Sequence, residues 1–183
     1  MKNSITIIAD ASFCSNTGAS GYGVWIAGSK GKGSFEGPLK QPRDNNVAET
    51  MAIANALWHG FQKGLITAKS DILIQTDSQS AIDLLKGLRL PSCQQYRDAL
   101  VYIQTLVSRY RLTLRYNHVR GHTNGQDNRT RAQRYCDLAA KRQMIIQRAE
   151  ILNQPVEQKP VRVTKGSTNY LRSRRRLKNG QTV

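Results

Sequence analysis

Short runs of apolar residues divide the first forty positions of the chain into three predicted strands. Residues 5–9 are apolar or β-branched and Asp10 follows them, so we expect a buried strand that ends on a carboxylate. Residues 21–28 and 32–37 give two further runs, with a glycine-containing turn between them. Strands joined this tightly are typical of an antiparallel meander.

The period of the apolar residues becomes helical after residue 46. Apolar side chains recur three or four positions apart over residues 47–61, which predicts a helix that one of the polar residues 44–46 caps. Residues 71–77 predict a fourth strand that ends on Asp77, as the first strand ends on Asp10.

The second half of the chain predicts three more helices and one more strand. One helix begins near Ser78, Pro91 opens another, and residues 112–119 form a fifth strand. A last helix runs from about Thr130 to Glu150. Strands and helices in this order indicate a mixed α/β fold.

Asp10, Glu49 and Asp77 each admit a structural explanation beside a catalytic one. The two aspartates would end neighbouring strands, where ligands of open α/β sheets gather. A strand end that enters solvent is the simpler explanation of Asp10 taken alone, and capping of the following helix by Asp77 or Ser78 is the structural explanation of Asp77. Glu49 lies in the first turn of its helix, where a carboxylate suits the positive end of the helix dipole.

Composition narrows the class of protein. The 183 residues suffice for one domain with an extension. No apolar run reaches the roughly 18 residues of a membrane span, and no signal-peptide pattern precedes the first strand. We therefore expect a cytoplasmic protein with no membrane partner. We also expect a monomer. The three irregularly spaced cysteines favour free thiols over disulfides or a zinc site.

The net charge of +16 favours a polyanionic partner, nucleic acid first among them. We divide the chain into a folded domain, residues 1–150, and a flexible basic arm, residues 151–183. The arm holds eight Lys or Arg residues against one acid. We expect its densest part to bind nucleic acid, with a protein partner as the alternative. That cluster consists of Arg172, Arg174, Arg175, Arg176 and Lys178.

Five motifs, in order along residues 5–141, resemble those of the type 1 ribonuclease H family. They are Asp10-Ala11-Ser12 with the later Gly21-Tyr22-Gly23, Asn45-Asn46-Val47-Ala48-Glu49, Thr76-Asp77-Ser78-Gln79, Val119-Arg120-Gly121-His122 and Cys136-Asp137-Leu138-Ala139. Each motif alone is weak evidence, but their shared order and spacing are specific. The resemblance implies a ribonuclease H-like α/β fold, with a five-stranded mixed sheet of three antiparallel and two parallel strands flanked by helices.

The resemblance also implies a catalytic centre of four carboxylates that bind two Mg²⁺ ions, or Mn²⁺: Asp10, Glu49, Asp77 and Asp137. Phosphodiester hydrolysis develops negative charge on the attacking and leaving oxygens, which two divalent cations stabilise. Carboxylates suit these hard cations, and without metal four clustered acids would raise one another's pKa values. For His122, on the Gly-His loop, the resemblance implies a role in proton transfer or product release.

The activity that the resemblance implies is endonucleolytic hydrolysis of the RNA strand of an RNA/DNA hybrid. Short polar side chains at loop and helix starts would contact this substrate: Ser12, Asn16, Asn45, Asn46 and Gln79. Such groups hydrogen-bond ribose 2′-hydroxyls and base edges in a shallow minor groove. Capping and turn formation are compatible second uses of the two asparagines.

Two departures from the family pattern concern the grip on the substrate. The stretch from Asp77 to His122 lacks the basic, Trp-bearing protrusion of some relatives, whereas the segment before Asp137 is long and carries three arginines. We therefore expect this segment and the arm to hold the hybrid. The arginines are Arg129, Arg131 and Arg134. Two alternatives stay open: a junction resolvase or integrase-like nuclease of related fold, and a non-catalytic nucleic-acid-binding module.

Overall fold

A five-stranded sheet forms the centre of the computed structural model, which describes residues 3–119 and 127–155. The strands are β1 (Ser4–Phe13), β2 (Ser20–Gly28), β3 (Gly31–Pro38), β4 (Asp71–Thr76) and β5 (Thr113–His118). Their order across the sheet is β3-β2-β1-β4-β5. The first three pair antiparallel, and β4 and β5 run parallel to β1. The predicted mixed sheet of three antiparallel and two parallel strands is confirmed.

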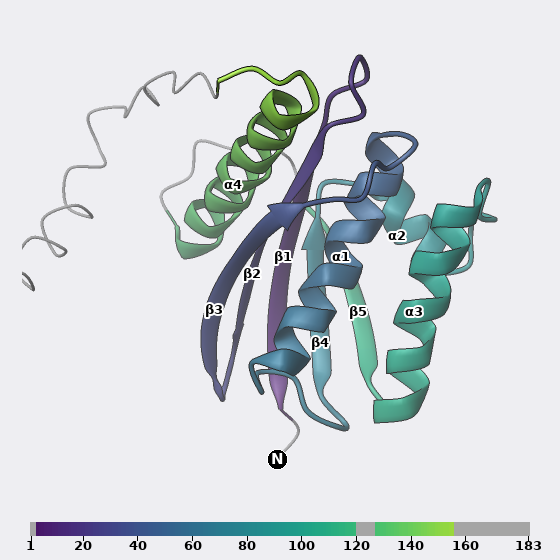
Figure 1. Ribbon diagram of the computed structural model, residues 1–183. Helices are drawn as coiled ribbons and strands as arrows, with labels where there is room; N and C mark the ends of the chain where they lie inside the picture. The colour runs from purple at the N-terminus through teal and green to yellow at the C-terminus, as the bar shows by residue number, and fades with distance from the viewer. Residues whose placement is uncertain (1–2, 120–126, 156–183) are drawn as a thin grey trace, which may run out of the picture.

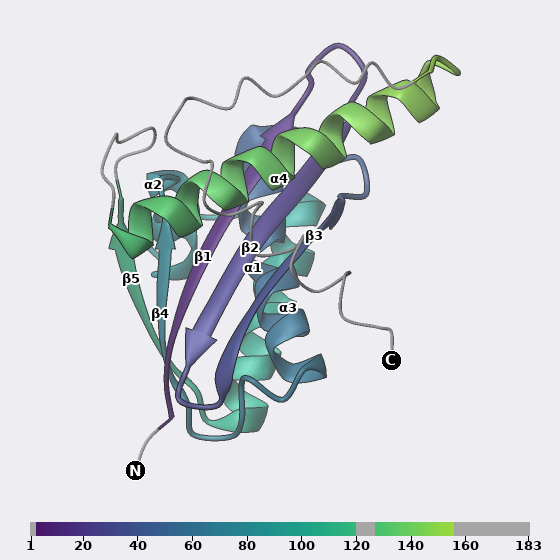
Figure 2. The same ribbon diagram turned by 90° about the vertical axis from the view of Figure 1, so that its left-hand side faces the viewer.

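Helices cover both faces of this sheet (Figure 1, Figure 2). They are α1 (Asn45–Gln62), α2 (Gln79–Leu85), α3 (Gln94–Tyr110) and α4 (Asn128–Ile151). On one face, α1 packs against β1 and β2 with α3 beside it. On the other face, α4 crosses β1, β2 and β3 (Figure 2). Within the described ranges, no helix combines the length and apolar character that a membrane span requires.

Branched aliphatic side chains fill the layer between the sheet and α1. Along β1 and β4, every second residue points into this layer, as the period of a strand requires. Complete burial of one such side chain stabilises the fold by about 1.5–3 kcal/mol. The central strand β1 and its neighbour β4 are therefore anchored in this layer. The largest fully buried members of this cluster are Ile5, Ile7, Ile26, Ile53, Leu57, Ile66, Ile72, Ile74 and Ile103.

β1 continues past Asp10, contrary to the prediction that it ends there. Its pairing with β4 stops where Ile8 lies opposite Gln75, but its pairing with β2 continues to Phe13 opposite Ser20. The backbone of β1 can stay extended because β2 still satisfies its hydrogen bonds along one side. Asp10 thus lies where β1 has lost one of its two neighbours.

The caps of α2 and α3 differ in part from the sequence-based expectation. Ser78 caps α2, because its Oγ accepts a hydrogen bond from the N–H of Ala81 at 3.2 Å. The explanation of Asp77 as the cap of this helix is therefore wrong. Pro91 does not open α3, which begins at Gln94 after the N-cap residue Cys93.

Candidate active site

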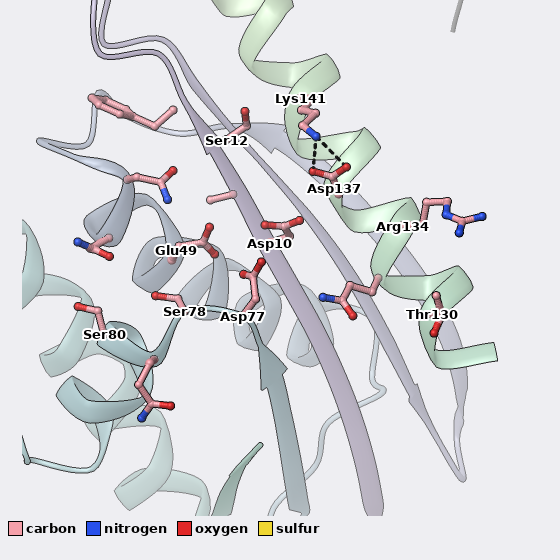
Figure 3. A pocket seen from close by; sticks show the side chains of 16 residues that line it. Asp10, Ser12, Glu49, Asp77, Ser78, Ser80, Thr130, Arg134, Asp137 and Lys141 are labelled. Carbon is pink, nitrogen blue, oxygen red and sulfur yellow. Dashed lines mark hydrogen bonds and ion pairs between the residues drawn. The ribbon is translucent and has the colours of Figure 1, made fainter. Parts of the chain in front are cut away.

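The four predicted carboxylates come from four different elements. Asp10 lies on β1, Glu49 on α1, Asp77 directly after β4 and Asp137 on α4. Each of the first three offers a carboxylate oxygen, and these oxygens all lie within 4.8 Å of one another. Figure 3 shows these three side chains gathered between the strand ends and α1. The fold therefore brings together acids that are far apart in the sequence.

The parallel register of β1 and β4 explains how the two aspartates meet. Ile8 lies opposite Gln75, and each aspartate follows its strand partner by two positions. Because parallel strands point the same way, both side chains reach the same edge of the sheet. The ring Nε2 of His118, on the neighbouring β5, lies 3.0 Å from the carbonyl oxygen of Asp77 and ties this residue to the sheet.

The start of α1 places Glu49. The side chain of Asp44 caps this helix by accepting a hydrogen bond from the N–H of Val47 at 2.9 Å, which fixes the first turn beside the strand ends. Glu49 follows one turn inside and is only 4% exposed. A glutamate that served the helix dipole alone would lie in solvent, so its burial beside two other acids needs a further explanation.

Burial and mutual repulsion raise the pKa values of two of these acids. Burial, followed by the charges of Asp77 and Asp137, raises the pKa of Asp10 from its ordinary 3.8 to about 7. Burial, followed by the charges of Asp10 and Asp77, raises the pKa of Glu49 well above its ordinary value. A backbone hydrogen bond from Ala11 opposes both shifts without cancelling them. Acids this close must retain protons or be neutralised by a cation.

The donor atoms of this cluster fit a divalent cation. Within the described part of the chain, Glu49 Oε2 is buried and has no hydrogen-bond partner. An unpaired buried carboxylate oxygen is costly, and a cation removes that cost. Three carboxylates are also the ligand type that Mg²⁺ and Mn²⁺ prefer. Asp10, Glu49 and Asp77 are therefore the residues best placed to hold such an ion.

Asp137 contributes no oxygen to this three-carboxylate group. Its two carboxylate oxygens lie 2.7 Å and 2.9 Å from Nζ of Lys141, one turn further along α4. The charge of Asp137 nevertheless reaches Asp10 and raises its pKa. The family-like motifs do not point to Lys141, although a lysine four positions after an acid on a helix predicts such a pair.

A cleft of about 650 Å³ surrounds the carboxylates. Four of the five predicted substrate contacts line it: Ser12, Asn45, Asn46 and Gln79. The fifth, Asn16, lies in the turn between β1 and β2 and does not line it. The part that these residues take in substrate binding stays a prediction. The cleft also has lining residues that no motif had singled out: Phe13, Ser80, Thr130, Gln133 and Lys141.

Other predicted residues lie away from the carboxylates or beyond the described residues. Of the three arginines before Asp137, Arg134 lines the cleft, with its side chain directed away from the acids in Figure 3. Arg129 and Arg131 do not line it. His122 and the basic cluster of the arm, residues 172–178, lie outside the described residues, so their roles stay predictions.

Comparison with known proteins shows which family and which solved structures the chain resembles. The model of the RNase H family matches residues 2–145 of the chain. No curated protein matches the sequence significantly. RNase H1 from the halophilic archaeon Halobacterium salinarum is 19% identical, with a TM-score of 0.61 over 77% of this chain and 97% of that one.

Two further solved structures resemble the chain to a similar degree. The N-terminal RNase H domain of Rv2228c from Mycobacterium tuberculosis is 19% identical, with a TM-score of 0.61 over 81% of this chain and 99% of that one. LC11-RNase H1, solved in complex with an RNA/DNA hybrid, is 18% identical, with a TM-score of 0.57 over 75% of this chain and 97% of that one. At these identities the likeness establishes the fold.

Proposed function

The chain belongs to the ribonuclease H family, and we propose that it is an endonuclease that hydrolyses the RNA strand of RNA/DNA hybrids with two divalent cations. The observation that carries this proposal is the meeting of Asp10, Glu49 and Asp77 within 4.8 Å of one another in an open polar cleft. A similar structure, LC11-RNase H1, was solved with such a hybrid, which supports this substrate class.

The four carboxylates would hold the cations. Asp10, Glu49 and Asp77 form one group of ligands, and Asp137 faces Asp10 from α4. Bound Mg²⁺ or Mn²⁺ would supply charge stabilisation for the attacking and leaving oxygens and lower the pKa of a bound water.

The fold of the protein holds the carboxylates in position. Asp10 stands on the central strand of the sheet, and Glu49 is packed into the base of the cleft. A catalytic constellation works only when its members are held within about 0.5 Å of the productive geometry. Glu49 is thus held by burial and Asp10 by the pairing of its strand, which restricts where each carboxylate can move.

The polar rim of the cleft suits recognition of ribose. Ser12, Asn45 and Asn46 lie at a strand end and a helix start beside the acids. Gln79 donates its amide N–H to Asp83 at 2.7 Å, and its amide oxygen can accept a hydrogen bond from a 2′-hydroxyl. The 2′-hydroxyl distinguishes RNA from DNA, so these contacts would select the RNA strand.

Two parts of the proposal rest on the sequence alone. His122 would assist proton transfer or product release, because its ordinary pKa lies near neutral pH. The basic arm, beyond residue 150, would add affinity by neutralising phosphates. The division into a catalytic domain, residues 1–150, and this arm is part of the same proposal.

The deciding experiment compares three labelled duplexes of one sequence: RNA/DNA, DNA/DNA and RNA/RNA. We expect cleavage of the RNA strand of the hybrid with Mg²⁺ and none with EDTA. Asp10→Asn and Asp77→Asn should abolish cleavage and leave hybrid binding largely intact. Asp98→Asn makes the same chemical change on the exposed surface of α3 and serves as the matched control.

Three outcomes would contradict the proposal. Equal cleavage of all three duplexes would indicate a general nuclease. Stronger cleavage of a four-way DNA junction would favour the resolvase alternative. Hybrid binding without metal-dependent cleavage would favour the alternative of a non-catalytic nucleic-acid-binding module.

A further inference from the structure

The ion pair between Lys141 and Asp137 lies inside the cleft (Figure 3). Both carboxylate oxygens of Asp137 contact the ammonium, at 2.7 Å and 2.9 Å. Arg134, the other basic residue that lines the cleft, points away from the acids in Figure 3. In the described part of the chain, Asp10, Glu49 and Asp77 form no ion pair. Asp137 is thus the one predicted metal ligand that already has a counter-ion.

The helix that carries this pair is anchored directly after Lys141. The guanidinium of Arg142 forms a two-point ion pair with Glu36 of β3, in which Nε donates to Oε1 at 3.0 Å. Gln143 Nε2 donates to the same oxygen at 2.9 Å. Because these contacts anchor α4 to β3, rotation about the bonds of the lysine side chain is the simplest way for the ammonium to leave Asp137.

A divalent cation would compete with this ammonium for the oxygens of Asp137, because both of these oxygens already contact Nζ. A cation that approaches Asp137 meets a positive charge at contact distance, and like charges that close repel even in a partly solvated site. The lysine side chain is 48% exposed and that of Asp137 is 25% exposed, so solvent weakens this repulsion but does not remove it. The lysine thus competes with a cation for this carboxylate.

We propose that Lys141 is a resident counter-ion that occupies Asp137 in the cation-free protein and competes with a divalent cation for this carboxylate. The inference rests on the proposed function, because it concerns the ligands of the same site. Lys141 acts through Asp137 and is therefore a positioning residue. It makes the Asp137 side of the centre bind cations more weakly than the side formed by Asp10, Glu49 and Asp77.

The test measures cation binding by the full chain without any nucleic acid. Bound Mn²⁺ is counted from the loss of the electron paramagnetic resonance signal of free Mn²⁺, at about 0.1 M salt. The variants are Lys141→Gln, which removes the charge, and Lys141→Arg, which keeps it. Arg148→Gln is the matched control on the same helix, since Arg148 is exposed and lies outside the cleft. It is roughly 16 Å from Asp137 along the helix axis, beyond the screening length of about 10 Å at this salt.

Lys141→Gln should bind Mn²⁺ roughly three- to tenfold more tightly than the unaltered chain. Lys141→Arg and Arg148→Gln should stay within twofold of it. In an Asp137→Asn background, the effect of Lys141→Gln should be clearly smaller, because the contact partner is gone and only the longer-range charge of Lys141 on Asp10 remains.

Unchanged or weaker binding by Lys141→Gln overturns the inference, as does an equal shift in Arg148→Gln or an undiminished effect in the Asp137→Asn background. No detectable Mn²⁺ binding by any variant overturns it as well. The binding measurement needs no substrate, so the inference about Lys141 can be refuted without refuting the proposed nuclease activity. A chain that shows the expected binding but does not cut the hybrid would refute the nuclease activity alone.

Discussion

Gly23 of β2 lies so close to Cys136 of α4 that a Cβ atom added to the glycine would stand 2.2 Å from the carbonyl oxygen of the cysteine. Gly23 is also the pairing partner of Asp10, and Asp137 directly follows Cys136. The contact therefore sets the distance between two predicted metal ligands that belong to different layers of the fold. The absence of a side chain at this position brings them within reach of each other.

Gly23→Ala should destabilise the protein and displace α4. Backbone atoms of a packed helix cannot yield as the end of a flexible side chain can, and overpacking of this kind costs about 1–3 kcal/mol. Urea unfolding measures the loss. Gly33→Ala is the control, because the added Cβ would meet the ring of Phe35 at 2.8 Å, which is side chain and partly exposed. If Gly23→Ala lowered the free energy of unfolding no more than Gly33→Ala does, the close packing of α4 against β2 would be contradicted.

Asp10→Asn should stabilise the cation-free protein at pH 8. The pKa of Asp10 is about 7 in the folded chain against an ordinary 3.8, so its ionised form disfavours folding. The stability that its protonated form contributes is complete below about pH 4 and is lost as the pH rises toward 7. We expect a gain of about 1–3 kcal/mol at pH 8 and a smaller one near pH 4.

Urea unfolding in EDTA at both pH values checks this prediction, with Asp98→Asn as the control for a lost surface charge. Mg²⁺ in place of EDTA should reduce the difference in free energy of unfolding between the variant and the unaltered chain. The ion binds the folded unaltered chain and stabilises it by mass action. If Asp10→Asn were less stable than the unaltered chain at pH 8, the conclusion that the ionised form of Asp10 disfavours folding would be contradicted.

Glu36→Gln should weaken the anchor of α4 by about 0.2–1 kcal/mol at pH 7, the range of partly exposed ion pairs. Burial raises the pKa of Glu36, but hydrogen bonds from Arg142 and Gln143 outweigh it and hold the pKa below the ordinary 4.5. Because the folded pKa is the lower one, this contribution is present above about pH 4.5 and is lost as the pH falls through the folded value. The urea midpoints of the two proteins should thus converge in acid. Glu150→Gln changes an exposed residue of α4. Its urea midpoint should not converge with that of the unaltered chain in acid.

Removal of residues 156–183 should weaken hybrid binding and flatten its dependence on salt. This segment holds eight basic residues and one acid, and each phosphate contact that it made would add to the salt slope. Fluorescence anisotropy with a labelled hybrid at several salt concentrations measures both quantities. α4 ends at Ile151, so the cut leaves every described element intact. An unchanged slope would show that the arm serves another partner.

Much of the fold follows from local patterns in the sequence. Alternating and helical periods predict the five strands and four helices of the described residues, because side-chain direction repeats every two residues in a strand and every 3.6 in a helix. Capping is local as well, but it can be misassigned between neighbours. Ser78 caps α2 where Asp77 was an equal candidate, since only the geometry decides which oxygen reaches the N–H of Ala81.

By itself, the sequence determined the elements, their order and the identity of four acids at positions 10, 49, 77 and 137. The tertiary structure decided how these acids relate. Pairing with β2 carries β1 past Asp10, and close packing on Gly23 sets the height of α4. The register of β1 with β4 and the packing of α1 bring Asp10, Glu49 and Asp77 within 4.8 Å of one another. The physical reason is that periodicity and capping act over a few residues, whereas the spacing of distant carboxylates depends on strand pairing and helix packing across the whole domain.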